Sequence, residues 1–167
     1  TEPQIKVQYL KFDPDVYKEQ VSVGEKELRD FYDANIENYK KEQTVEARHI
    51  LIKADEEADF EIVEKARQLS VEVMNLARGG EDFAELAKKY SEGPSKDSGG
   101  YLGAFKKKDM VAPFSEKAFS MKPGEISEPV RTKFGWHIIK VEKVNEETVV
   151  SFESAMAEIS RKLKAEK

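Results

Sequence analysis

The sequence predicts an α+β fold over about residues 45–145, flanked at both ends by helical segments. Two observations lead to this class. Stretches with strand alternation and stretches with helical spacing follow one another as strand, helix, helix, strand, short helix, strand, strand. The last two stretches are joined by a short turn, and a mixed order that closes with a hairpin is typical of a sheet with helices packed against it.

Side-chain periodicity predicts the first strand and the helices that follow it. In VEARHILIK (45–53) apolar and polar residues alternate, and one face carries Val45, Ala47, His49 and Leu51. An acidic loop, ADEEAD, leads into a long helix that two glycines end. Its apolar stripe is predicted to be Ile62, Ala66, Leu69, Val73 and Leu76. Asp82, three residues before Glu85, is expected to cap a second, short helix.

The second half of the domain is rich in turn residues. Residues 91–105 form a Gly-, Ser- and Pro-rich loop that ends in a short strand, and APFSEKAFSM follows as a short helix. KPGE is a turn, because Pro and Gly set the backbone angles that a turn needs. ISEPVRTKFGWHIIKVEKV then predicts a β-hairpin with its turn near residues 133–135.

The flanks divide the chain into three parts: 1–44, 45–145 and 146–167. Residues 4–12 alternate as a short strand or arm, and a capping box of Ser22 and Glu25 predicts a helix over 23–39. The tail predicts a helix over 151–163, with its apolar stripe at Phe152, Met156, Ile159 and Leu163. These apolar faces must pack on the central domain, on each other or on a region outside this chain.

Composition excludes several classes of function. The net charge of −5 argues against a nucleic-acid or anionic-membrane binder, which normally has a basic excess. The absence of cysteine excludes a thiolate nucleophile, a disulfide framework and a Cys-ligated zinc site. No stretch approaches the roughly 20 apolar residues of a membrane span, and TEPQIKVQYL lacks the features of a signal peptide. A start of this kind fits a mature form or a fragment, so any membrane anchor is expected outside this chain.

The two histidines are the first candidate site. His49 and His137 each precede an apolar run and a lysine, in HILIK and HIIK. One interpretation is two separate core histidines, each satisfied by a hydrogen bond. The other is a single site, because strands from opposite ends of a small α+β domain often pair at its centre. Two adjacent histidines would then share one hydrogen-bond network.

Apolar side chains supply a second candidate set: Leu102, Phe105, Met110, Phe114, Phe119, Phe134 and Trp136. Most such residues form the core, which is the interpretation that we favour for Phe119. Leu102, Met110 and Phe114 lie in or beside loops, where a shallow apolar pocket for a ring such as proline is a better fit. Three other motifs have plain structural explanations. The Lys106–Lys108 run is a solvated loop, SGGYLG lacks the frame of a nucleotide loop, and the acids of 55–61 lack calcium-site spacing.

Longer motifs carry a family resemblance. In one order the chain contains ARHILIK, FAELAKKYSEGPSKDSGGYLGAF and MVAPFSEKAFSMKPGEISEPVRTKFGWHIIKV. It thereby resembles the parvulin family of peptidyl-prolyl cis/trans isomerases over about residues 45–145. The flanking helices are similar to those of bacterial envelope foldases of the SurA, PrsA and PpiD kind. The resemblance implies a four-stranded antiparallel sheet wrapped by helices, with the two histidines adjacent on its central strands.

The resemblance also implies roles for individual residues. His49 and His137 match the paired histidines, and Thr132 matches the hydroxyl that bonds to them. The residues that match the proline-ring pocket and its rim are Leu102, Met110, Phe114 and Phe134. The family normally has Asp or Cys where this chain has Gly93; Glu92 is the neighbouring carboxylate that could substitute through a small shift of the loop. Members that prefer phosphorylated substrates carry a basic cluster after the first strand, whereas this chain has acids there and would repel a phosphate.

Two functions remain open from the sequence. The first is an isomerase that acts on X-Pro bonds of unfolded, non-phosphorylated polypeptides in the periplasm or cell envelope. The second is a client-binding chaperone module with little or no turnover, which Gly93 favours. Neither needs a cofactor or a metal, because rotation about an amide bond needs neither. In both cases the expected partners are unfolded or nascent polypeptides that contain proline.

Overall fold

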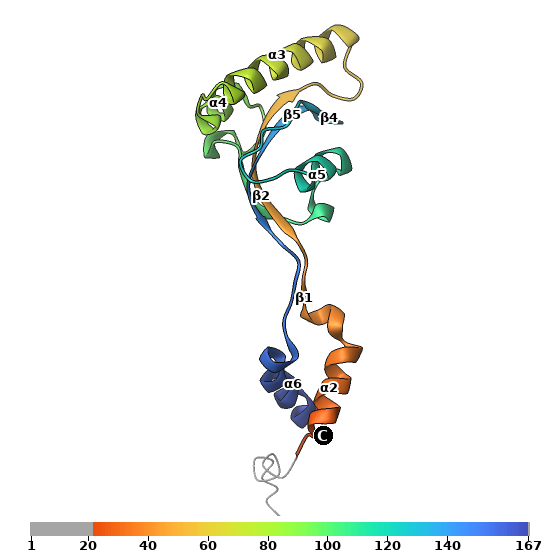
Figure 1. Cartoon of the computed structure of the whole chain (residues 1–167). Helices are drawn as coiled ribbons and strands as arrows, with labels where there is room; N and C mark the ends of the chain where they lie inside the picture. The colour runs from red at the N-terminus through yellow and green to blue at the C-terminus, as the bar shows by residue number, and fades with distance from the viewer. Residues whose placement is uncertain (1–21, 167) are drawn as a thin grey trace, which may run out of the picture. The chain divides into compact units, whose positions relative to one another are not determined.

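A four-stranded antiparallel sheet forms the centre of the larger unit of the protein (Figure 1). The computed structural model describes residues 22–166, so the predicted strand over 4–12 lies outside the described residues. One compact unit is Glu42–Thr148, and the described residues on either side of it form a second unit. The strands of the sheet are β2 (Thr44–Lys53), β3 (Tyr101–Phe105), β4 (Val130–Thr132) and β5 (Gly135–Asn145), in the order β3-β2-β5-β4.

The first and last long strands of this unit, β2 and β5, pair at its centre. They run antiparallel from the pair of Thr44 and Asn145 to the pair of Lys53 and Gly135. The α+β class and the four-stranded antiparallel sheet are therefore confirmed. The hairpin is also confirmed, since β4 pairs with β5 and two residues, 133 and 134, separate its end at Thr132 from the start of β5 at Gly135.

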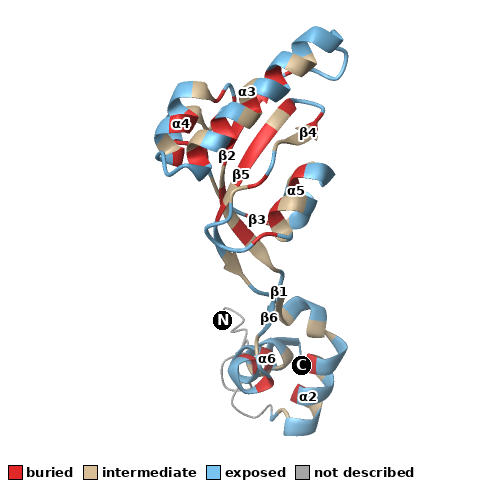
Figure 2. Cartoon of the chain, turned by 45° about the horizontal axis from the view of Figure 1, so that its top comes forward, coloured by how far each residue is buried: buried red, intermediate tan, exposed pale blue. Residues whose placement is uncertain are grey.

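Helices cover both faces of the sheet. The helices α3 (Phe60–Arg78) and α4 (Phe83–Tyr90) lie on one face and α5 (Ala112–Phe119) on the other, with single 3-10 turns at Lys96–Ser98 and Lys107–Asp109 (Figure 1). The alternation of the strands therefore supplies two cores, and both faces of the central strands are buried (Figure 2). Ile50, Ile52 and Ile138 face α3 and α4, whereas Ala47 and Ile139 face α5.

The buried face of α3 agrees with the predicted stripe except at Ile62: Ala66 and Val73 are buried, and Leu69 and Leu76 pack against the same core. Ile62 is 51% exposed, and the helix contacts the core through residues that include Ala66, Ser70, Val73 and Ala77. Small side chains let the helix approach the sheet closely, and Ile62 in the first turn remains outside this contact. The predicted end of α3 and the predicted start of α4 are confirmed. Gly79 is the C-cap of α3, and at the N-terminus of α4 the Asp82 carboxylate accepts a hydrogen bond from Glu85 N at 2.9 Å.

The second unit is a pair of helices, α2 (Glu25–Ala34) and α6 (Phe152–Glu166), which pack on each other. Their buried core consists of Leu28, Tyr32, Phe152, Ala155 and Ile159. A 3-10 turn, Ile36–Tyr39, follows α2, and two-residue strands β1 (Lys40–Lys41) and β6 (Thr148–Val149) stand where the chain passes between the units.

Two details of these helices correct the predictions. The N-cap of α2 is Gly24, without a side-chain bond, so Ser22 and Glu25 do not form the predicted capping box. Glu25 is the first residue of the helix, whereas a capping box needs Glu at the third. Met156 is 40% exposed, because the apolar face of α6 turns through Ala155 instead.

Candidate active site

The two histidines meet on the face of the sheet that α5 covers. In the register of β2 and β5, His49 stands opposite Ile139 and His137 stands opposite Leu51, so the histidines are diagonal neighbours. Side chains at diagonal positions of an antiparallel pair lie within reach of each other when they are large. Their Nδ1 atoms are 3.0 Å apart, and their rings stack with centroids 5.3 Å apart. The structure thus brings the two histidines together, as one site would require.

A chain of hydrogen bonds extends from both ends of this pair. Thr132 Oγ1 lies 2.7 Å from His137 Nε2, as expected from the resemblance, and it accepts a hydrogen bond from Phe134 N at 3.2 Å. At the other end, Ser95 Oγ lies 3.1 Å from His49 Nε2. No role for Ser95 was predicted from the sequence. Its only sequence signal is its place in the loop between α4 and β3.

Burial keeps both imidazoles neutral. His49 is 7% exposed and His137 is 4% exposed. Burial lowers the pKa of His49 from 6.5 to about 4. Burial, together with the neighbouring His49, lowers the pKa of His137 to about 3. The hydrogen bond between the two Nδ1 atoms contains one proton. Because a charged imidazole carries a proton on both nitrogens, the two rings cannot both be charged while this bond exists.

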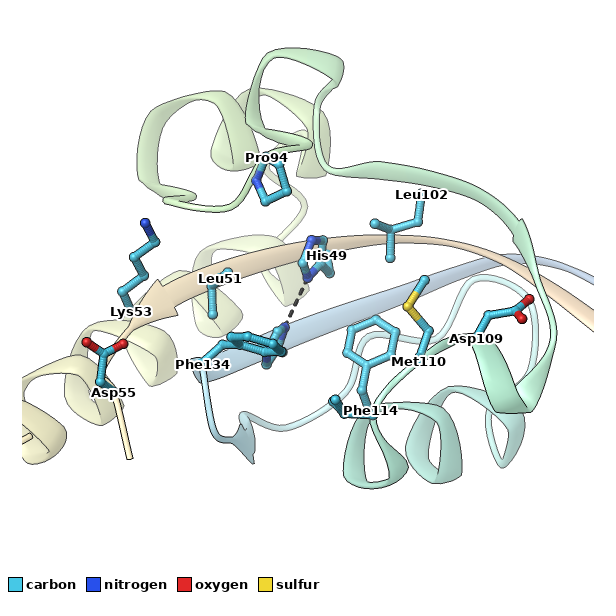
Figure 3. Close-up of a pocket in the computed structure, with 12 residues that line it drawn as sticks. His49, Leu51, Lys53, Asp55, Pro94, Leu102, Asp109, Met110, Phe114 and Phe134 are labelled. Carbon is cyan, nitrogen blue, oxygen red and sulfur yellow. Dashed lines mark hydrogen bonds between the residues drawn. The ribbon is translucent and has the colours of Figure 1, made fainter. Parts of the chain in front are cut away.

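An apolar pocket of about 730 Å³ lies above the histidine pair (Figure 3). All four side chains that the sequence assigned to a pocket line it: Leu102, Met110, Phe114 and Phe134. Phe114 is buried and stands edge-on to both imidazoles, at ring-centroid distances of 5.6 and 5.3 Å. Phe134 is 47% exposed, which agrees with a place at the rim.

Further residues complete the lining: Leu51, Lys53, Asp55, Pro94, Asp109 and Val111. No pocket role was predicted for them, because their place there depends on how the end of β2, the loop after α4 and the segment before α5 come together. Lys53 and Asp55 place opposite charges at one end of the pocket, beside Phe134 (Figure 3). The pocket is therefore apolar over the histidines and charged at this end.

Residue 93 lies directly beside His49. A Cβ built on Gly93 would stand 3.6 Å from His49 Nε2 and 3.4 Å from Leu51 Cβ, which are ordinary contact distances. The neighbouring Glu92 does not take this place: its carboxylate accepts a hydrogen bond from Lys53 N at 2.7 Å, at the end of β2. The expectation that Glu92 could substitute for the missing side chain is therefore not met by its position.

The arrangement suits the binding and positioning of an apolar group. Within residues 22–166, no group of three or more His, Cys, Asp or Glu side chains could hold a metal ion. None of the helices in that range is both long enough and apolar enough to cross a membrane. What the site offers is an apolar pocket with a neutral, hydrogen-bonded floor.

Comparisons with known proteins agree with this geometry. Residues 49–143 match the family model of rotamases, the PPIC-type PPIase domain, so the chain belongs to this family of parvulin-type peptidyl-prolyl isomerases. The foldase protein PrsA of Caldanaerobacter subterraneus subsp. tengcongensis is 43% identical over 129 residues, which are 77% of this chain and 37% of that protein. PrsA of Geobacillus kaustophilus is 41% identical over 150 residues, or 89% of this chain and 46% of that protein.

A solved structure of a SurA-like chaperone from Campylobacter jejuni is also similar. It superposes with a TM-score of 0.73 at 33% identity, over 91% of this chain and 60% of that one. The resemblance to the parvulin family and to SurA-like and PrsA-like foldases is thereby confirmed. The chain spans less than half the length of the two PrsA relatives.

Proposed function

We propose that this chain is a peptidyl-prolyl cis/trans isomerase that acts on X-Pro bonds of unfolded, non-phosphorylated polypeptides and so assists folding in the cell envelope. The observation that carries the proposal is the apolar pocket closed from below by a neutral histidine pair. In this proposal residues 45–145 are the catalytic domain, and 1–44 and 146–167 are flanking segments that assist client binding.

The chemistry of the reaction fits such a pocket. Rotation about an X-Pro bond has a barrier of ~18–20 kcal/mol, because the amide loses its resonance in the twisted state. The planar amide has the larger charge separation, and water stabilises it more than it stabilises the twisted form. A pocket that excludes water and holds the ring therefore favours the twisted state relative to the planar one.

Each residue has a role in this proposal. Leu102, Met110 and Phe114 hold the proline ring, and Phe134 covers it from the rim. His49, His137 and Thr132 form a rigid floor of fixed dipoles without a net charge. A charged floor would attract water into the pocket and stabilise the planar amide, so the low pKa values of both histidines support the proposal.

The charged end of the pocket supports a substrate without phosphate. Lys53 is the one cation in the lining; Asp109 lies beside Met110 at the far end of the pocket, and Asp55 lies with Lys53 (Figure 3). Glu56 and Glu57 follow in the same acidic loop. The acids of this loop would repel a phosphate dianion. Proline-containing polypeptides without phosphate are therefore the proposed clients.

Location and anchoring are proposed from the relatives. The similar proteins are described as foldases and as SurA-like chaperones, one of them in a set that includes a periplasmic protein. We propose an extracytoplasmic location for this chain, with any membrane anchor outside residues 1–167. Fractionation of cells that express the natural full-length protein would test both points.

A second function, client binding with little turnover, is favoured by Gly93. This residue places no side chain beside His49, where the family resemblance implies Asp or Cys. The pocket itself would still grip a proline ring. Both functions therefore predict that the chain binds clients, but only the isomerase predicts that it accelerates isomerisation.

A protease-coupled assay on a panel of short Xaa-Pro peptides separates them. Acceleration by the wild-type chain that Phe114→Ala and His49→Ala abolish would establish the isomerase and locate its site. Specific binding of an unfolded client without acceleration would favour the binding module. If client binding survives the double replacement of Met110 and Phe114 by Ala, the proposed pocket is wrong under both functions.

A further inference from the structure

Ser95 occupies a position that the proposed function does not yet use. Its hydroxyl is the partner of His49 Nε2, yet Ser95 does not line the pocket. The serine lies in the loop between α4 and β3, 46 residues from His49. It therefore acts on the pocket only through the imidazole, and the question is what that contact determines.

The backbone holds this serine firmly in place. Gly100 N donates a hydrogen bond to Ser95 O at 2.8 Å, and His49 N donates one to Gly100 O at 2.9 Å. Ser95 is thus connected to His49 in two ways: through the backbone of Gly100, and through the hydrogen bond between Ser95 Oγ and His49 Nε2. Gly100 has φ +77°, and a Cβ there would stand 2.2 Å from His49 O, so only glycine permits this close approach.

The hydrogen bonds also favour one direction of proton donation along this chain. The buried Thr132 hydroxyl accepts from Phe134 N, and His137 Nε2 is the acceptor within reach of its own proton. His137 then carries its proton on Nδ1 and donates it to His49 Nδ1, at 3.0 Å. His49 is left with its proton on Nε2, and Ser95 Oγ accepts it. In this direction each buried donor of the chain, from Phe134 N to His49 Nε2, has an acceptor.

Gly93 explains why Ser95 is needed. A side chain at residue 93 would stand beside His49 Nε2, at 3.6 Å from its Cβ, and a carboxylate there could accept the same proton. With glycine at this position, the serine two residues further on is the acceptor. Without Ser95, the buried Nε2 proton would have no partner among the described residues, which is costly for a group shielded from water.

We propose that Ser95 is the positioning residue of the histidine pair: it fixes the tautomer of His49 in place of a side chain at residue 93. The proposal rests on the proposed isomerase function for its effect on rate, but its effect on the tautomer is independent of activity. Removal of the hydroxyl is expected to release the His49 proton to either nitrogen and to lower kcat/KM about tenfold, which is the size of one hydrogen bond to a buried group.

The tautomers can be measured directly on the wild-type chain. The chain has 2 histidines, so the imidazole signals in a spectrum of ¹⁵N-labelled protein belong to this pair. We expect the Nε2–H tautomer for His49 and the Nδ1–H tautomer for His137 at pH 7. The opposite pair of tautomers, or a rapid mixture of both, would overturn the proposal without any activity measurement.

Variants then test the role of the serine. Ser95→Ala should shift His49 towards a mixture of tautomers. Ser95→Thr keeps the hydroxyl and should therefore give the same imidazole spectrum as the wild type. Ser98→Ala is the matched control, because Ser98 is exposed in the same loop and its hydrogen bonds in the part of the chain that the structure describes are made by its backbone N and O, which alanine keeps.

The sharpest test combines residues 93 and 95. Gly93→Asp in the Ser95→Ala background should restore a single His49 tautomer and most of the lost kcat/KM, while Gly93→Asp alone should change the rate less than threefold. If Ser95→Ala behaves like Ser98→Ala, or if Gly93→Asp restores nothing, Ser95 does not position the pair. If the wild-type chain has no isomerase activity but its tautomers respond as described, the proposed function fails and the role of Ser95 stands.

Discussion

Acidification tests the neutral histidine pair. Both folded-state pKa values are depressed, to about 4 for His49 and about 3 for His137, from 6.5 in the unfolded chain. A depressed pKa contributes stability that is fully present above the unfolded value. That stability is lost as the pH falls towards the folded values, because the unfolded state binds protons that the folded state does not. The free energy of unfolding should therefore fall between pH 6.5 and pH 4.

The magnitude follows from the pKa values. One pKa unit corresponds to about 1.4 kcal/mol, and pH 5 lies about 1.5 units below the unfolded value of 6.5, so each histidine should cost about 2 kcal/mol there. The pair together should cost about 4 kcal/mol, a large share of the ~5–15 kcal/mol by which domains are stable. Carboxylates titrate mainly below pH 5, so the range from pH 7 to pH 5 reports on the 2 histidines of the chain.

Urea unfolding at several pH values, followed by the fluorescence of Trp136 in the sheet domain, measures this loss. His49→Gln supplies the control, because a glutamine amide does not titrate. Measured relative to its own stability at pH 7, this variant should lose about half as much as the wild type by pH 5. A wild-type free energy of unfolding that stays constant from pH 7 to pH 5 would show that the histidines charge freely in the folded protein. The neutral floor of the pocket would then be wrong.

Four further substitutions follow from single contacts. Phe114→Ala removes a buried ring that stands edge-on to both imidazoles, so it should cost ~3–5 kcal/mol of stability in urea unfolding and abolish peptide binding measured by titration calorimetry. Met110→Ala should weaken the same binding, while Met156→Ala, in the second unit, should leave it unchanged. Gly100→Ala should lower the free energy of unfolding by more than ~3 kcal/mol, because the added Cβ would stand 2.2 Å from His49 O. Gly103→Ala is its control: Gly103 has a similar φ of +71° but nothing within 4 Å, so this change should cost only ~1–2 kcal/mol. Asp82→Ala removes the cap of α4 and should cost ~1 kcal/mol, and an unchanged midpoint in thermal melting would contradict that role.

Much of the sheet could be predicted because its information is local. Alternation placed His49 and Leu51 on one face of β2, and that face is the one with the pocket. The pairing of β2 with β5 required one further inference, that the outer strands of the domain meet at its centre. That inference determines the histidine contact, since the diagonal register brings His49 and His137 together.

Features that depend on the path of a loop or on close packing could not be predicted. Ser95 reaches His49 only because the loop returns to β2 through Gly100, and nothing in the local sequence specifies that return. The position of Glu92 depends in the same way on a backbone donor, Lys53 N, at the end of β2. The buried face of α3 depends on how closely its small side chains let the helix approach the sheet. Periodicity alone does not predict that distance.

Two glycines in the same loop show how differently one residue type can act. Gly100 is required by geometry, because its φ of +77° and its contact with His49 O exclude a side chain. Gly93 is not required in this sense: it does not have a positive φ, and a Cβ there would make only ordinary contacts of 3.4–3.6 Å. The backbone would accept a side chain at residue 93, so the consequence of glycine there is chemical. It leaves the His49 Nε2 proton to Ser95, a neutral acceptor, and keeps a negative charge away from the pair. A carboxylate at residue 93 could accept the same proton, but its negative charge would raise the pKa of His49.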